Sequence, residues 1–280
     1  MYSLWRNKTD RNKMKIRQIV QERLDSIFGK DNYYLICIAI AGSHAYGVQT
    51  KDSDYDIMGI VLPPIGYILG LNKFEQTVFE KRNGDLIDGP VFNFVKWFKL
   101  MIDQNPNSLE LLWHETSQYV YRDSFIWPKL FKNRDQFLSK KLKHSFGGYA
   151  FAQLNRLDKL NEKVNENPKR LEEFRKFGYS TKNASHMMRL LNMCLDALVE
   201  KEVKVMRPER HFLTSIRDGM FKYEEIVKMA NDKFRMIEEA YMRSDLRNKI
   251  DYEFANNFQV NILKNYIQSL INKEGDLNNA

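Results

Sequence analysis

Cysteine is scarce in this sequence. Only two occur among 280 residues, Cys37 and Cys194, and each lies in an apolar run. A disulfide framework or a cysteine-rich zinc site requires more cysteines at closer spacing, so both kinds of protein are excluded. We therefore expect two buried free thiols and the reducing conditions of the cytoplasm.

Long apolar runs are also missing. No uninterrupted apolar stretch approaches the length of a membrane-spanning helix, which needs about 18 residues or more. Residues 1–8 are polar and basic and contain no apolar segment of the kind found in a secretory signal. The sequence therefore predicts no membrane span, no membrane partner and no secretion.

The chain does contain ample apolar material and a surplus of positive charge. It is 43% hydrophobic and 29% charged, a composition that supports a buried core and excludes a disordered chain. Lys and Arg number 44 against 36 Asp and Glu, which gives a net charge of +8. Such a surplus favours phosphate-rich partners. Two basic stretches, residues 1–24 and 129–144, suit nucleic acid in particular.

The hydrophobic pattern changes character along the chain. Its first part predicts strands and helices in mixture: a helix over 12–28, strands over 33–41, 54–62, 74–82 and 86–94 with a turn at Asn83 and Gly84, and helices over 94–103 and 107–113. From about residue 123 the spacing is helical, near 124–140, 147–164, 168–177, 183–201, 208–218, 222–244 and 251–272, apart from a short extended piece at 202–205. We therefore predict an α+β fold, with a small mixed sheet and flanking helices in residues 1–122 and an all-helical unit in residues 123–280.

The residues that suggest chemistry lie where the first predicted strand ends and the second begins. Gly42 and Ser43 follow the first strand, while Asp54 and Asp56 are two residues apart, so their side chains share one face of the second. Two close carboxylates repel each other unless a cation lies between them, and Mg²⁺ prefers carboxylates together with phosphate oxygens. Glycine lets the backbone approach a phosphate, to which the serine hydroxyl can donate. The combination predicts a triphosphate site beside a two-metal site, whereas either pair alone fits a solvated turn.

The spacing from Gly42-Ser43 to Ser53-Asp54-Tyr55-Asp56 resembles the signature of the DNA polymerase beta superfamily of nucleotidyltransferases. Other blocks are similar to the RNA-repair-pathway branch of that superfamily. They are residues 42–47, 52–56 with Gly59, Lys96, 105–106 with 109–112, 148–150 with Gln153, 178–184 with His186, Arg189 and 190–191, and 207–210 with 216–219. The resemblance covers roughly residues 40–220 and implies a nucleotidyltransferase domain over 1–122 and a helical domain that binds substrate or nucleotide over 123–280.

The resemblance also implies a third metal-binding carboxylate on a neighbouring strand. The best match is Asp88, with Asp85 and Glu80 as competing candidates and an ordinary turn aspartate as the alternative role. Asp54, Asp56 and Asp88 would then hold Mg²⁺, or Mn²⁺ in its place. Asp88 would also help to deprotonate the acceptor hydroxyl.

Basic side chains provide further candidates for nucleotide binding. His44 lies inside the glycine–serine segment, where it can contact a phosphate or only fill the loop. Lys182, His186 and Arg189 are spaced i, i+4 and i+7, so they share one face of a predicted helix. That face suits a triphosphate or an acceptor backbone, or is merely solvated. Glu110 is predicted on a helix, either in a functional position or paired with a nearby base.

The function expected from these features is nucleotidyl transfer. A hydroxyl would attack the α-phosphorus of a nucleoside triphosphate, and pyrophosphate would leave. RNA is the acceptor that the resemblance and the net charge favour, at a 3′ end in repair or tRNA processing. Two alternatives stay open: transfer to a protein or small-molecule hydroxyl, and a non-catalytic module that binds nucleotide or RNA.

Overall fold

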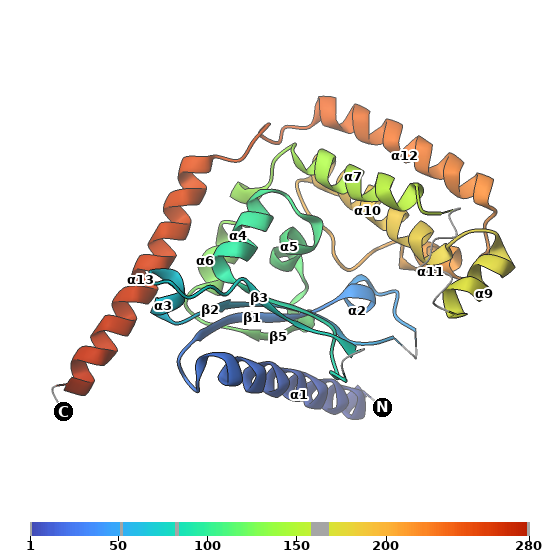
Figure 1. The fold of residues 1–280 in the computed structure, drawn as a ribbon. Helices are drawn as coiled ribbons and strands as arrows, with labels where there is room; N and C mark the ends of the chain where they lie inside the picture. Colours follow the sequence, from blue (N-terminus) through green and yellow to red (C-terminus); the bar gives the residue numbers. More distant parts are fainter. Residues whose placement is uncertain (1, 51–52, 82–83, 158–167, 279–280) are drawn as a thin grey trace.

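The computed structural model describes residues 2–50, 53–81, 84–157 and 168–278 (Figure 1). The strands are β1 (Tyr34–Ala41), β2 (Asp56–Leu62), β3 (Gln76–Phe79), β4 (Gly89–Asn93) and β5 (Tyr119–Arg122). The α-helices are α1 (Tyr2–Phe28), α2 (Gly42–Tyr46), α3 (Ile65–Ile68), α4 (Phe94–Ile102), α5 (Pro106–Glu110), α6 (Trp127–Lys132), α7 (Leu142–Leu154), α9 (Pro168–Phe177), α10 (Thr181–Glu200), α11 (Arg210–Arg217), α12 (Tyr223–Arg243) and α13 (Tyr252–Asn278). Short 3₁₀ helices are η2 (Leu111–Trp113), η3 (Thr116–Gln118) and η4 (Arg134–Phe137).

The sheet has five strands in the order β3-β4-β2-β1-β5. The β2–β4 pair is parallel, whereas the other pairs are antiparallel, so the sheet is mixed. The interior of β1 is buried along its whole length because helices cover both faces of the sheet, which explains why its sequence is almost continuously apolar. The predicted α+β class, a small mixed sheet with helices, is confirmed.

Helices cover the two faces of the sheet unequally (Figure 1). On one face lies α1, which buries Ile16, Val20, Leu24 and Phe28 at intervals of four residues. On the other face lie α4, α5 and α6, and beyond them the helical second half. Trp97 and Phe98 of α4 are fully buried between the sheet and the C-terminal helices. The chain therefore has a small core between α1 and the sheet, and a much larger core between the opposite face of the sheet and the remaining helices.

The second half is built around α10, which packs against α7, α11 and α12. Ser180 caps the start of α10 by accepting a hydrogen bond from the backbone N–H of Asn183. The last helix, α13, returns to the first half, where Phe258 stacks on Phe98 with 6.0 Å between ring centroids and the Tyr266 hydroxyl lies 3.2 Å from the carbonyl of Pro63. The division at residues 122 and 123 stays a prediction, and across it the large core is continuous.

Several elements differ from the sequence prediction. Strand β5 was not predicted because its four residues are too few to show a pattern, and it becomes a strand only by pairing with β1. The predicted strand 54–62 begins only at Asp56, and the predicted helix 124–140 is broken into α6 and η4. Residues 202–205 interrupt the helices, as predicted, without pairing as a strand, and Val203 and Val205 are buried. Asn83 of the predicted turn, Asp52 of the resemblance and the end of the predicted helix 147–164 lie outside the described residues.

Two expectations concern the cysteines and the membrane. Cys37 and Cys194 are both free and buried, as predicted. Burial raises the pKa of the Cys37 thiol and raises that of Cys194 to about 12, so both are protonated. Among the described residues, no helix has the length and apolar character needed to cross a membrane.

Candidate active site

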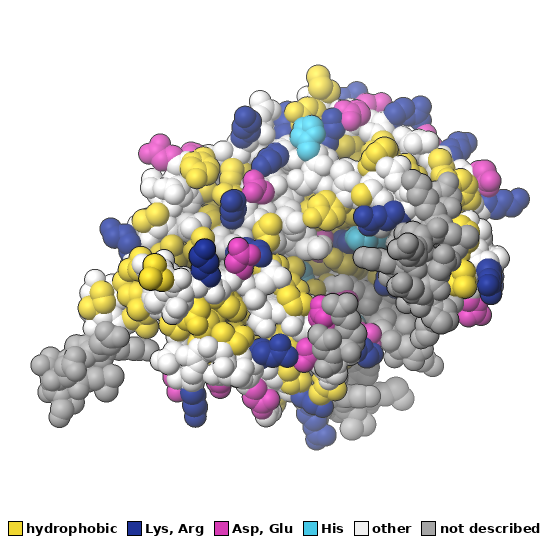
Figure 2. All heavy atoms as spheres, viewed as in Figure 1, with side chains coloured by type: hydrophobic (Ala, Val, Ile, Leu, Met, Phe, Trp, Pro, Cys, Tyr) yellow, Lys and Arg dark blue, Asp and Glu magenta, His cyan; other side chains and the backbone are white. Residues whose placement is uncertain are grey.

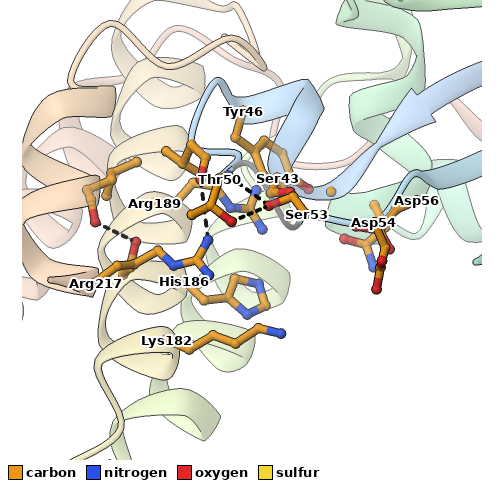
Figure 3. A pocket seen from close by; sticks show the side chains of 15 residues that line it. Ser43, Tyr46, Thr50, Ser53, Asp54, Asp56, Lys182, His186, Arg189 and Arg217 are labelled. Carbon is orange, nitrogen blue, oxygen red and sulfur yellow. Dashed lines mark hydrogen bonds between the residues drawn. The ribbon is translucent and has the colours of Figure 1, made fainter. Parts of the chain in front are cut away.

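A cavity of about 630 Å³ opens between α2 and α10 (Figure 3). One wall comes from the end of β1, from α2 and from the start of β2, and the opposite wall comes from α10 and α11. The lining residues are Gly42, Ser43, Tyr46, Val48, Thr50, Ser53, Asp54, Asp56, Asn107, Lys182, Ser185, His186, Arg189, Leu213 and Arg217. The structure therefore brings the glycine–serine turn, the aspartate pair and the basic helix face to one cavity.

Gly42 is required by the close approach of β1 to β2. The two strands pair antiparallel, so Ala41 at the end of β1 lies opposite Asp56 at the start of β2. Gly42 has φ +60, and a Cβ on it would lie 1.8 Å from Oδ2 of Asp56. Any side chain there would displace the Asp56 carboxylate. The absence of a side chain at Gly42 thus leaves room for the carboxylate of Asp56, which lies fourteen residues later in the sequence.

Asp88 lies directly beside Asp56. The segment before β4 forms a parallel bridge with the start of β2: the N–H of Ile57 donates to the carbonyl of Asp88 at 2.7 Å, and the N–H of Asp88 donates to the carbonyl of Tyr55 at 3.1 Å. Asp88 and Asp56 also line a smaller cavity of about 190 Å³ that shares Gly42, Tyr46 and Asn107 with the main one.

The charges around Asp56 affect its protonation. Burial raises the pKa of Asp56, and the nearby Asp88 carboxylate raises it further, as Asp54 does to a smaller extent. Lys182 acts in the opposite direction, because its positive charge favours the ionised form. This crowding of negative charge is what a bound cation would relieve.

Asp85 and Glu80, the other candidates for the third carboxylate, lie in surroundings different from those of Asp88. Asp85 forms an ion pair with Arg23 of α1 at 2.9 Å and accepts a hydrogen bond from the backbone N–H of Glu80 at 2.9 Å. Neither Asp85 nor Glu80 is among the residues that line the two cavities around Asp56. These contacts favour Asp88 as the third member of the set.

Asp54 lines the main cavity with Asp56 but pairs with a lysine. Its carboxylate forms an ion pair with Lys81, which lies between β3 and β4. Within the ranges that the structure describes, no three His, Cys, Asp or Glu side chains are close enough together to hold a metal ion. The structure thus brings Asp56 and Asp88 together, whereas Asp54 would have to leave Lys81 to join them.

His44 makes its contacts inside the loop. Its ring stacks on that of Tyr55 with 4.5 Å between centroids and an interplanar angle of 11°, and Nε2 lies 3.4 Å from the carbonyl oxygen of Ser53. It is not among the residues that line the cavity. The observed contacts therefore fit the alternative that this histidine fills the loop and supports the segment carrying Asp54 and Asp56.

The basic face of α10 splits into an exposed and a buried part. Lys182 is exposed, and its side chain extends into the cavity towards the aspartates (Figure 3). Arg189 is buried, pairs with Glu110 at 2.9 Å and lies over the ring of Tyr46 at 3.6 Å. Although burial opposes its charge, Tyr46 and Glu110 raise the pKa of Arg189 above the ordinary value. The charge of Arg189 is therefore balanced within the protein, whereas Lys182 is exposed in the cavity and makes no ion pair with the described part of the chain.

Tyr46 completes this buried cluster. Its hydroxyl donates to Oε2 of Glu110 at 2.7 Å, and burial raises its pKa, so it remains a donor. Tyr46 belongs to α2, Glu110 to α5 and Arg189 to α10, so the three side chains join three elements around the cavity. The sequence prediction treated Glu110 as a possible half of an ion pair, and the structure supplies Arg189 as the other half.

Other lining residues were not singled out from the sequence. Tyr46 and Arg217 lie within the blocks 42–47 and 216–219 of the resemblance. The Arg217 guanidinium donates to the carbonyl of Val48 at 3.3 Å at the cavity wall, which Asn107 also lines. Thr50 and Ser53 carry no pattern in the sequence and become neighbours through a turn in which the N–H of Thr50 donates to the Ser53 hydroxyl at 2.8 Å.

His186 is expected to reduce stability in mild acid. Burial, with the charges of Arg189 and Lys182, lowers its pKa from 6.5 to about 3. The unfolded chain therefore takes up the proton first, and stability is lost as the pH falls below the unfolded value of 6.5. We expect this group to lower the free energy of unfolding by about 2 kcal/mol between pH 8 and pH 5. Urea unfolding at both pH values should show a smaller loss for His186→Gln, and an equal loss in both proteins would contradict the assignment.

The mixed sheet, with a glycine–serine turn facing Asp56 at the start of β2, is that of a nucleotidyltransferase of the polymerase beta superfamily. The comparison with protein families makes this assignment specific. The sequence profile of RlaP, the RNA repair pathway DNA polymerase beta family, matches residues 16–261. The chain belongs to this family, and the resemblance seen in the sequence is confirmed.

Individual relatives are similar over parts of their length. The chain is 30% identical over 123 residues to an uncharacterized 38.9 kDa protein from the nrdC-mobD intergenic region of Enterobacteria phage T4, which is 41% of this chain and 36% of that protein. It is 30% identical over 111 residues to the uncharacterized protein YcgL of Bacillus subtilis (strain 168), 39% of this chain and 40% of that one. Each match therefore spans well under two thirds of the relative.

A solved structure was also found. The nucleotidyltransferase-like protein from Exiguobacterium sibiricum 255-15 is similar over 82% of this chain and 74% of that one, with 12% identity and a TM-score of 0.30. With this TM-score and identity, the positions of site residues in the two proteins cannot be equated.

Proposed function

We propose that this protein transfers a nucleoside monophosphate from a nucleoside triphosphate to an RNA hydroxyl with the help of Mg²⁺. The observation that carries the proposal is the meeting of Asp56 and Asp88 beside Gly42. Asp56 also lines the main cavity, whose opposite wall holds Lys182. Family membership supports the same reaction class. The transferred group, the metal and the acceptor are part of the proposal.

The acidic residues fit a hard divalent cation. Asp56 and Asp88 would hold it, joined by Asp54 once that side chain leaves Lys81. Carboxylate oxygens are the ligands that Mg²⁺ prefers, and Mn²⁺ accepts them too. When bound, such an ion supplies positive charge that stabilises the attacking and leaving oxygens. The raised pKa of Asp56 is consistent with this role, because burial first and the Asp88 carboxylate second disfavour its ionised form, which a bound cation would favour.

The remaining cavity residues suit a triphosphate. Lys182 and Arg217 offer positive charge from the helical wall, and Ser43 offers a hydroxyl from the opposite wall. His186 stays neutral because of its lowered pKa, so it can exchange hydrogen bonds without adding charge. In this proposal Arg189 positions α10 against α2 and α5 and leaves contact with the phosphates to Lys182.

RNA is the acceptor we favour. The family description names an RNA repair pathway, and the chain has a net charge of +8. On the face seen in Figure 2 the Lys and Arg side chains are spread widely and interspersed with Asp and Glu, without forming one continuous stripe. Because RNA binding neutralises phosphates with Lys and Arg, we expect its affinity to fall as the salt concentration rises.

The alternative of a non-catalytic module is disfavoured by Asp56 and Asp88. Their adjacency raises the pKa of Asp56, which means that the ionised carboxylate is disfavoured in the fold. A module that only binds RNA does not need a carboxylate whose ionisation is disfavoured by a second carboxylate beside it.

The test is an incorporation assay. Each labelled nucleoside triphosphate is incubated with the protein and Mg²⁺, in the presence of total RNA, total protein or no acceptor. We expect label in RNA and release of pyrophosphate, with little label elsewhere. Label in the protein fraction would support the alternative acceptor, and absence of pyrophosphate release with all four nucleotides would contradict nucleotidyl transfer.

A further inference from the structure

A second cavity, of about 570 Å³, lies between the α4–α5 connection and α7. Its polar lining includes Asp103, Asn105, His144, Tyr149, Gln153 and Arg156. Three of the sequence features marked above meet here: Asn105, the Gly148–Tyr149 pair and Gln153. None of these residues is among those that line the active-site cavity.

Gln153 places an amide at the wall of this cavity. The residue is 9% exposed and lines the cavity, and within the described part of the chain its side chain makes no hydrogen bond. Its amide atoms are not among the fully buried polar atoms that lack a partner, so they are open to the cavity. A ligand in the cavity can therefore exchange hydrogen bonds with this amide.

Tyr149 is held in place for stacking. Asn105 caps α5 by accepting from the N–H of Ser108 at 3.2 Å, and its amide N–H donates to the Tyr149 hydroxyl at 3.1 Å. The Tyr149 ring is 45% exposed, and because its oxygen is the acceptor in this bond, its own proton is free to be donated. An exposed aromatic ring and the amide of Gln153 therefore line the same cavity.

Gly148 keeps the approach to this ring open. A Cβ on Gly148 would meet nothing within 4 Å, and the same holds for its neighbour Gly147. Glycine within a helix costs about 1 kcal/mol relative to alanine, and here no close packing requires it. Gly148 lines the cavity whereas Gly147 does not. At Gly148 the missing side chain therefore leaves room for a flat group.

An aromatic platform, an amide and a nearby cation are the means by which proteins bind unpaired nucleobases. Arg156 is exposed at this cavity and offers a charge to a phosphate. Asn105 lines this cavity and Asn107 lines the active-site cavity. The Cα atoms of two residues that are two positions apart can be at most about 7 Å from each other, so the two cavities are neighbours. One polynucleotide strand can therefore reach both.

We propose that this cavity binds an unpaired base of the RNA acceptor, stacked on Tyr149 and hydrogen-bonded to Gln153. This inference rests on the proposed function, because it names the part of the acceptor that the enzyme recognises. It assigns to α7 a role in selecting single-stranded over paired RNA, since a paired base cannot present its edge and face together.

The test uses two neighbouring glycines. Gly148→Leu adds a side chain at the cavity, and Gly147→Leu adds the same side chain at the adjacent position outside the cavity; at both positions the added Cβ meets nothing within 4 Å. Both changes replace glycine in a helix, so both proteins should fold. The measurement is fluorescence anisotropy of a labelled short single-stranded RNA and of its duplex, without nucleotide or metal, and the Kd of nucleoside triphosphate is measured separately.

We expect Gly148→Leu to weaken single-strand binding roughly tenfold to a hundredfold, the loss of one stacked base. Gly147→Leu should bind the single strand as wild type does, and both variants should bind duplex and triphosphate normally. Equal single-strand affinity of the two variants would overturn the proposal, as would an equal loss of duplex binding. Because the assay needs no turnover, failure of nucleotidyl transfer would appear separately, in the incorporation assay.

Discussion

Asp56→Asn is expected to lower the rate of nucleotidyl transfer by about a thousandfold or more, because a metal-bound transition state loses several kcal/mol of charge stabilisation. The substitution keeps the shape of the side chain and removes only its charge. Since Asp56 is disfavoured in its ionised form by burial and by Asp88, the variant should also unfold at an equal or higher temperature than wild type. Single-turnover kinetics and thermal unfolding measure the two effects.

The matched control for this variant is Asp85→Asn. Asp85 was the competing candidate and carries the same carboxylate, but it is tied to Arg23 outside the cavities around Asp56. We expect Asp85→Asn to retain transfer at close to the wild-type rate. Normal turnover by Asp56→Asn, or a collapse of activity in Asp85→Asn alone, would refute the proposed acidic set.

Glu110→Gln is expected to destabilise the protein by about 3–5 kcal/mol, because it leaves the charge of Arg189 buried without a counter-charge. Both side chains of this pair are at most 5% exposed, and their separation is 2.9 Å. The loss should appear in the free energy of unfolding from urea titrations. Removing both charges in Glu110→Gln/Arg189→Met should recover much of the stability, because no unpaired charge remains.

A surface ion pair provides the comparison for Glu110. Lys96 pairs with Glu75 at 2.7 Å, but the Glu75 side chain is largely exposed. Lys96→Met should change the free energy of unfolding by less than about 1 kcal/mol. A similar small change for Glu110→Gln would show that the buried pair is not the structural link described above.

The sequence predicted those parts of the fold that have a strong local pattern. The strand β1 and the helix α10 were found because a continuous apolar run and a helical repeat are visible in one short window. Strand β5 was missed because its four residues become a strand only through pairing with β1, a contact between distant parts of the chain. Likewise the helix predicted over 124–140 ends early at Asn133, where α6 gives way to η4.

The candidate site shows the same contrast. Asp54 and Asp56 could be paired from the sequence because they are two residues apart, and Lys182, His186 and Arg189 because helical spacing puts them on one face. Nothing local indicates that Arg189 meets Glu110, 79 positions away, and so the sequence left its charge available to a ligand. The ion pair of Asp54 with Lys81 is equally non-local and could not be foreseen.

The return of α13 to the first half has a consequence for biosynthesis. Residues 252–278 leave the ribosome after the sheet, α4 and the cavity walls have all been made, yet Phe258 and Tyr266 cover the surface formed by Phe98 and the end of β2. Until then the nascent chain presents apolar side chains to water. A chain truncated before α13 should therefore be a target for chaperones and proteases, and the enzyme should mature only after translation has passed this helix.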